Sequence, residues 1–102
     1  MKLVPIVIAA ATLLCAPAFA SKDLAQKNNC MACHAVDKKM LGPAFQEVAK
    51  KYGGKKDADA VLAGSIKGGG SGKWGPIPMP AQAALSEADA KVLAIWVLAG
   101  AK

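Results

Sequence analysis

The chain has little cysteine and only one histidine. Its three cysteines are Cys15, Cys30 and Cys33, too few for the framework of several disulfides that supports many small exported domains. Cys30, Cys33 and the single histidine, His34, provide only three potential zinc ligands, which is fewer than a structural zinc site uses. The composition therefore excludes a disulfide scaffold and argues against a zinc domain.

The first 20 residues have the pattern of a secretory signal peptide. A short basic start at Met1-Lys2 is followed by an apolar run. Ala18-Phe19-Ala20 then has the small-residue pattern of a cleavage site. We therefore expect residues 1–20 to be removed by cleavage before Ser21. Residues 21–102 should then form one small exported domain.

Two features of this segment suggest alternatives to a cleaved leader. A membrane anchor would need about 20 apolar residues, and the run from Leu3 to Leu14 is shorter and contains Pro5. Cys15 suggests a lipoprotein, but Leu14 before it is larger than the small residue usual at that position. We expect no membrane span in the mature form.

The chain has no arginine, and its charge is one-sided. All 13 basic residues are lysines, and the predicted mature domain retains 12 of them against 7 acidic residues, a net charge of +5. Because the protein is exported and lacks arginine, we expect no nucleic-acid partner. A basic surface that steers the protein toward an acidic protein partner is the preferred interpretation. A lysine-rich surface that serves only solubility is the alternative.

An exported domain of 82 residues usually needs disulfides, a metal or a cofactor to support its core. Cys30-Met31-Ala32-Cys33-His34 has the spacing of a c-type haem attachment site. Two thiols at this spacing can add to the two vinyl groups on one edge of the porphyrin, and the adjacent histidine becomes an iron ligand. We predict one covalent haem c, attached at Cys30 and Cys33, with His34 as the proximal ligand.

The sixth iron ligand must be a methionine, if there is one, because no second histidine exists. Met31 lies between the attached cysteines and cannot cross the ring. Met40 is only six residues beyond His34 and is interpreted as a core residue. Met79 is flanked by prolines that restrict its backbone, so it is the predicted ligand. A filled coordination shell favours an electron carrier over an enzyme.

The sequence pattern predicts an all-α domain. Glycine, proline and capping residues divide the chain into four short helices and a non-helical segment at 74–80. The expected helices are Lys22–Asn28 capped by Ser21, Phe45–Tyr52, a helix capped by Asp57 that ends at Lys67, and one capped by Ser86 that ends near Ala99. The expected apolar faces are Val61, Leu62 and Ile66 on the third helix, and Ala88, Val92, Ile95, Trp96 and Ala99 on the last.

Four stretches resemble the small bacterial class I cytochromes c of the c-551/c-552 type. They are residues 28–34, residues 40–44, Trp74-Gly75-Pro76-Ile77-Pro78-Met79-Pro80 and residues 95–98. The resemblance implies the class I fold, with about four short helices around one haem. It also implies a periplasmic one-electron carrier that works between a quinol-oxidising complex and a terminal reductase or oxidase, such as nitrite reductase or cytochrome oxidase. We expect a monomer that meets its redox partners transiently.

The resemblance also implies roles for residues around the haem. The Pro43 carbonyl should accept a hydrogen bond from His34 Nδ1, the Trp74 indole should donate to a haem propionate, and the Gln82 amide should approach the methionine sulfur. Two positions differ from the family pattern. Ser65 stands where relatives often have arginine near a propionate, and Ala25 replaces an aromatic residue of the first helix. The terminal helices should then meet through Leu24, Val92, Ile95 and Trp96.

The sequence leaves one alternative function open and predicts one docking surface. A haem enzyme or gas-binding sensor with a labile Met79 would bind CO when reduced, whereas a carrier would not.

For a carrier, we expect an apolar ring at the exposed haem edge, rimmed by lysines. The ring should contain Met31, Ala32, Ile77 and Ala81, and the rim should contain Lys27, Lys38, Lys39 and Lys73.

Overall fold

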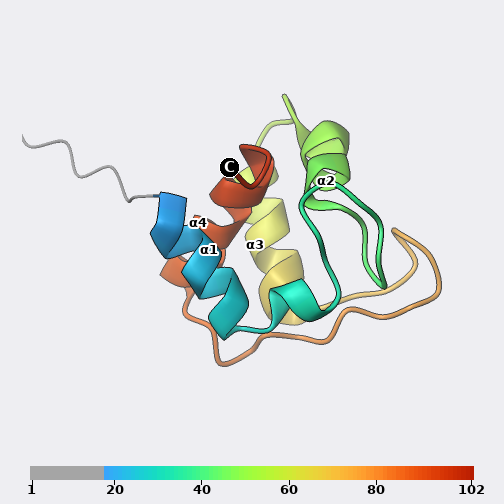
Figure 1. The fold of residues 1–102 in the computed structure, drawn as a ribbon, viewed down its shortest axis with the longest axis horizontal. Coiled ribbons are helices and arrows are strands. Elements are labelled where there is room, and N and C mark those ends of the chain that lie inside the picture. Colours follow the sequence, from blue (N-terminus) through green and yellow to red (C-terminus); the bar gives the residue numbers. More distant parts are fainter. Residues whose placement is uncertain (1–17) are drawn as a thin grey trace, which may run out of the picture.

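The computed structural model describes residues 18–102, with side chains from residue 21 onward. This part of the chain contains four α-helices and one 3₁₀ turn (Figure 1). The elements are α1 (Ala18–Lys27), η1 (Cys30–Ala32), α2 (Phe45–Tyr52), α3 (Ala58–Gly68) and α4 (Glu87–Leu98). The described residues form no strand, only one isolated antiparallel bridge between Gly70 and Met79. The all-α prediction is confirmed, as is the absence of helix at 74–80.

Helix α4 lies at the centre of the domain and contacts α1, α2 and α3 (Figure 1). Its buried side chains are Ala90, Leu93, Ala94, Trp96 and Val97. The apolar face predicted for this helix is therefore wrong except for Trp96. Ala88, Val92, Ile95 and Ala99 are exposed, and Ile95 retains 52% of its accessible surface. The helix has apolar residues on both sides. Two faces at helical spacing were therefore equally compatible with burial, and periodicity alone could not show which one is buried.

Helix α1 begins earlier than predicted, at Ala18 rather than Lys22. Ser21 is a buried residue inside the helix, not its N-cap. No glycine or proline separates Ala18 from Ser21, so nothing in the sequence stops the helix there. Apart from Ala18–Ala20, the predicted leader and Cys15 lie outside the described residues.

The contact between the terminal helices also differs from the prediction. Ala25 is fully buried in the core cluster with Leu93, Ala94 and Trp96, and Leu24 packs against that cluster. Val92 and Ile95 take no part because they lie on the exposed side of α4. The small side chain of Ala25 therefore lies within the contact between α1 and α4.

The starts of the other helices largely follow the sequence. Helix α2 has the predicted bounds, and the Ser86 hydroxyl accepts a capping bond from the Asp89 N–H at 3.1 Å. Asp57 occupies the N-cap position of α3, but its side chain makes no capping bond and its φ is 58°. Leu62 is buried on α3 as expected, whereas Val61 is exposed, since it lies about 100° around the helix from Leu62.

Two long connections complete the domain, residues 28–44 and residues 69–86 (Figure 1). Both line a cavity beside the helical core. In the described part of the chain, no helix has the length and apolar character needed to cross a membrane.

Candidate functional site

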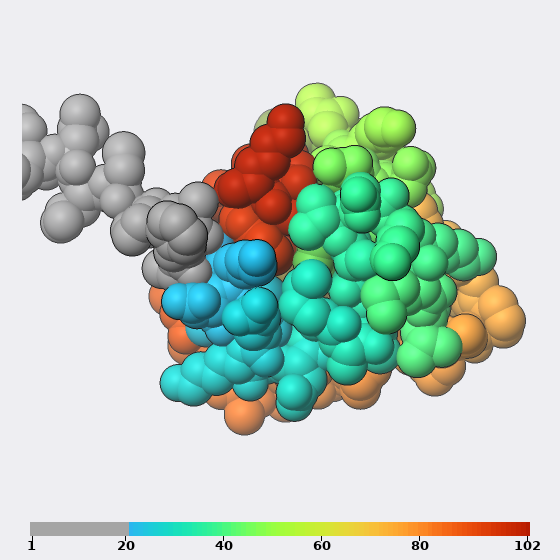
Figure 2. Space-filling model, in the orientation of Figure 1, coloured from blue at the N-terminus to red at the C-terminus, as the bar shows by residue number. Residues whose placement is uncertain are grey.

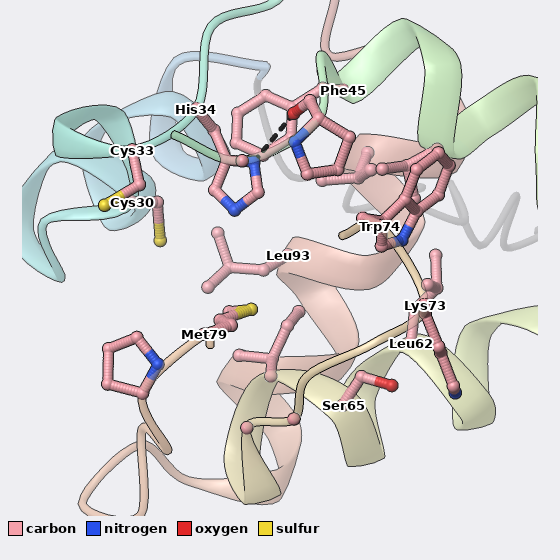
Figure 3. Close-up of a pocket in the computed structure, with 18 of the residues that line it drawn as sticks. Cys30, Cys33, His34, Phe45, Leu62, Ser65, Lys73, Trp74, Met79 and Leu93 are labelled. Carbon is pink, nitrogen blue, oxygen red and sulfur yellow. Dashed lines mark hydrogen bonds between the residues drawn. The ribbon is translucent and has the colours of Figure 1, made fainter. Parts of the chain in front are cut away.

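A cavity of about 210 Å³ lies between the helices and the two long connections (Figure 3). Core side chains of α2, α3 and α4 form much of its wall, so the wall is mainly apolar. These residues include Phe45, Val48, Leu62, Leu93, Ala94, Trp96 and Val97. A site of this kind suits a large apolar ligand held by a few polar groups.

The 3₁₀ turn η1 places both cysteines of the C-x-x-C-H motif at one end of the cavity (Figure 3). Asn29 starts the turn with a φ of 59°, and the His34 N–H donates to the Cys30 carbonyl at 3.0 Å. Cys30 and Cys33 are not joined by a disulfide. Burial raises the pKa of the Cys30 thiol, which favours its neutral form.

The imidazole of His34 is fixed by three contacts. Its Nδ1 lies 2.8 Å from the Pro43 carbonyl oxygen, which is the hydrogen bond that the family resemblance implied. Its ring stacks on Phe45, with 5.0 Å between centroids. Gly42 packs against the ring so closely that a Cβ there would lie 2.5 Å from His34 Cε1. With the proton on Nδ1, the lone pair of Nε2 is left for a ligand in the cavity (Figure 3).

Met79 lies across the cavity from His34 (Figure 3). Its backbone is held by two hydrogen bonds with Gly70, at 2.7 Å from the Met79 N–H and 3.1 Å to the Met79 carbonyl. Gly69 has a φ of +67°, and a Cβ at this position would lie 2.5 Å from the Met79 carbonyl oxygen. The close approach of the two chain segments at the base of the loop therefore needs glycine at position 69.

Trp74 and Lys73 line the end of the cavity away from the cysteines (Figure 3). Trp74 is 39% exposed, and the Lys51 ammonium lies 4.4 Å from the centroid of its ring. Ser65 also reaches the cavity. Its hydroxyl donates to the Val61 carbonyl of its own helix at 3.1 Å, so its one hydrogen-bond donor is already used within α3.

Three other sequence expectations have different outcomes. Gln82 is not among the residues that line the cavity, and its backbone N–H donates to the Ile66 carbonyl at 3.0 Å. Met40 is 43% exposed, so its interpretation as a core residue is wrong. The chain turns sharply there, because the Met40 N–H donates to the Gly42 carbonyl. Met31 packs against the core cluster and does not line the cavity.

The sequence did not indicate the packing roles of Gly42, Gly69, Phe45 and Lys51. In the sequence, Gly42 stands out only as part of the stretch 40–44 that resembles the family, and Gly69 only as one of several glycines between two expected helices. Phe45 was seen only as the first residue of a helix. Each role depends on a residue that is distant in sequence or on a loop whose path the sequence does not fix.

The donors around the cavity fit a covalently attached haem. Two thiols lie at one end, an imidazole nitrogen faces inward from one side, and a thioether residue lies on the opposite side (Figure 3). Thiols can form the thioether links, while imidazole and thioether are the axial ligand types of cytochromes c. The apolar wall suits the porphyrin.

Comparisons with known proteins agree with this fit. The family model "Cytochrome c" matches residues 20–100. Cytochrome c-552 of Nitrosomonas europaea is 56% identical over 90 residues, which cover 88% of this chain and 87% of that protein. Cytochrome c-551 of Pseudomonas aeruginosa is 48% identical over 93 residues, which cover 89% of this chain and 88% of that protein.

Solved structures show the same relationship. The crystal structure of wild-type Nitrosomonas europaea cytochrome c552 is 57% identical and superposes with a TM-score of 0.75, covering 78% of this chain and 98% of that one. A class 1 cytochrome from Sideroxydans lithotrophicus is 33% identical with a TM-score of 0.70, covering 84% and 98%. The chain therefore belongs to the cytochrome c family of electron carriers, which bind covalent haem c.

Proposed function

We propose that residues 21–102 form a periplasmic one-electron carrier, and not an enzyme, after a signal peptide of residues 1–20 is removed. Cys30 and Cys33 would hold the haem covalently, and His34 and Met79 would be the axial iron ligands. One observation carries this proposal: His34 and Met79 lie on opposite sides of an apolar cavity that has both cysteines at one end.

When bound, the haem supplies an iron that gains and loses one electron. The protein's part is to keep the surroundings of that iron the same in both states. The Pro43 carbonyl and the Phe45 ring fix the orientation of His34, and Gly70 fixes the backbone of Met79. Because neither ligand has to move, little reorganisation accompanies electron transfer. Trp74 lies at the end of the cavity where its indole N–H can serve a haem propionate.

The partners proposed are a quinol-oxidising complex as donor and a terminal reductase or oxidase as acceptor, such as nitrite reductase or cytochrome oxidase. A carrier must release each partner quickly, so the interface should be small. Ala32, Ile77 and Ala81 of the predicted apolar ring are exposed, and Ile77 retains 57% of its accessible surface. Met31 is half-buried and contributes less. The rim lysines are all exposed: Lys27, Lys38, Lys39 and Lys73.

The electrostatic part of docking predicts a salt effect. The bimolecular rate of electron transfer to an acidic redox partner should fall as ionic strength rises, because salt screens the attraction of the lysine-rich surface. Stopped-flow kinetics from low to physiological salt measures it. A rate that stays constant over this range would show that steering by the lysines is absent and that apolar contact alone governs docking.

A visible spectrum of the exported protein, oxidised and reduced, tests the proposal when combined with a haem stain on a denaturing gel. A carrier should keep its haem on the gel, show six-coordinate spectra in both states and fail to bind CO when reduced. Rapid CO binding would favour the alternative, a gas-binding sensor or haem enzyme with a labile Met79. Loss of the haem stain would contradict covalent attachment.

A further inference from the structure

Residues 71–78, here called the ligand-loop tip, have little support from the rest of the protein. All eight residues are exposed. Their internal hydrogen bond joins the Gly72 N–H to the Gly75 carbonyl at 3.0 Å. Gly72 and Gly75 have φ values of +90° and +120°, so the backbone runs through conformations that glycine permits and that other residues avoid.

One exposed side chain of helix α2 makes two contacts with this tip. Lys51, on α2, places its ammonium 4.4 Å from the centroid of the Trp74 ring. The same ammonium lies 3.5 Å from the Lys73 carbonyl oxygen, to which it donates. Among the hydrogen bonds between described residues, this one alone joins the tip to another part of the protein.

Two other lysines at or just beyond the C-terminal end of α2, Lys50 and Lys55, make their contacts away from the tip. Lys50, the neighbour of Lys51, pairs with Glu47 at 3.5 Å on the outer surface of α2. Lys55 lies over the Tyr52 ring, 5.4 Å from its centroid. The contact is therefore specific to one position on α2 and is not a general effect of lysine-rich composition.

We propose that Lys51 is a positioning residue that fastens the ligand-loop tip to α2 and thereby slows the opening that would release Met79 from the iron. The proposal rests on the proposed function, in which Met79 is an iron ligand. Met79 directly follows the tip, and its backbone is held at the base of the loop by Gly70. Any opening of the loop wide enough to withdraw Met79 must also carry Trp74 away from the wall of the cavity.

The first test measures motion of the tip directly in the haem-loaded protein. Amide hydrogen exchange at Gly72, whose N–H donates the hydrogen bond inside the tip, should be about two- to fivefold faster in Lys51→Met than in wild type, the size expected for loss of an exposed cation–π contact. Lys50→Met removes the same charge from the same helix and should leave this rate unchanged. Lys51→Arg should retain slow exchange, because a guanidinium also stacks on an indole.

The second test measures release of the ligand. Cyanide should bind to the ferric form of Lys51→Met about two- to fivefold faster than to wild type or Lys50→Met, provided that Met79 release limits the rate. Equal exchange rates in Lys51→Met and Lys50→Met would overturn the fastening role. Faster exchange without faster cyanide binding would overturn its link to Met79. If Met79→Ala also leaves cyanide binding unchanged, the assignment of Met79 as an iron ligand fails. The exchange rates then still test whether Lys51 fastens the tip.

Discussion

Replacing Met79 by alanine should lower the reduction potential and open the sixth coordination position to external ligands. A thioether is a soft, weak donor that stabilises ferrous iron, so its loss favours the ferric state. We expect a fall on the order of 0.1 V, a fraction of the roughly 0.8 V range over which axial ligands set haem potentials. Redox titration measures the shift, and binding of imidazole to the ferric protein measures access to the iron.

Met40→Leu is the matched control. Met40 is exposed on the turn after the attachment motif, away from the residues that line the cavity. Its replacement should leave the potential and imidazole binding unchanged and should cost less than about 1.5 kcal/mol of unfolding free energy. If Met79→Ala kept its potential and stayed closed to imidazole while Met40→Leu lost both properties, the two methionines would have to exchange roles.

The sequence predicted helix boundaries best where local chemistry sets them. Gly53-Gly54 ends α2, and the Ser86 hydroxyl starts α4. Burial was predicted less well, because α4 has apolar residues around most of its circumference and its packing against three other helices decides which are buried. The start of α1 was misplaced for another reason: Ser21 suits an N-cap, but the alanines before it favour helix, and the helix begins at Ala18.

The candidate site shows the same contrast between features set by local chemistry and features set by packing. The attachment motif and the proline-flanked Met79 could be found from sequence because each is a short pattern with its own chemistry. Gly69 could not, since its importance comes from the Met79 backbone ten residues later, against which no side chain fits. Lys51 could not, since it meets Trp74 across 23 positions of the chain. For Gln82, expected near the methionine sulfur, the structure gives a contact of the backbone N–H with Ile66 on α3, so the role of its side chain stays a prediction.

The doubly substituted chain Cys30→Ala/Cys33→Ala, purified without haem, should have no cooperative fold. Without haem, the apolar side chains that line the cavity of about 210 Å³ would face water. Burying one such side chain contributes roughly 1.5–3 kcal/mol, so leaving several of them uncovered removes an amount comparable with the whole stability of a small domain. The double variant retains no cysteine in residues 21–102, so no disulfide within this domain can replace the lost stabilisation.

Circular dichroism during heating measures this effect, with wild-type holoprotein for comparison. Cys30→Ala alone is the control, because Cys33 can still hold the haem, and the haem then fills the cavity. We expect the single variant to unfold cooperatively at a reduced temperature and the haem-free double variant to show low helix content with no transition. Side chains such as Leu62, Leu93 and Trp96 then have no surface to pack against on the cavity side. A cooperative transition in the double variant at the wild-type temperature would mean that the helices form a sufficient core among themselves and that the haem adds little to folding.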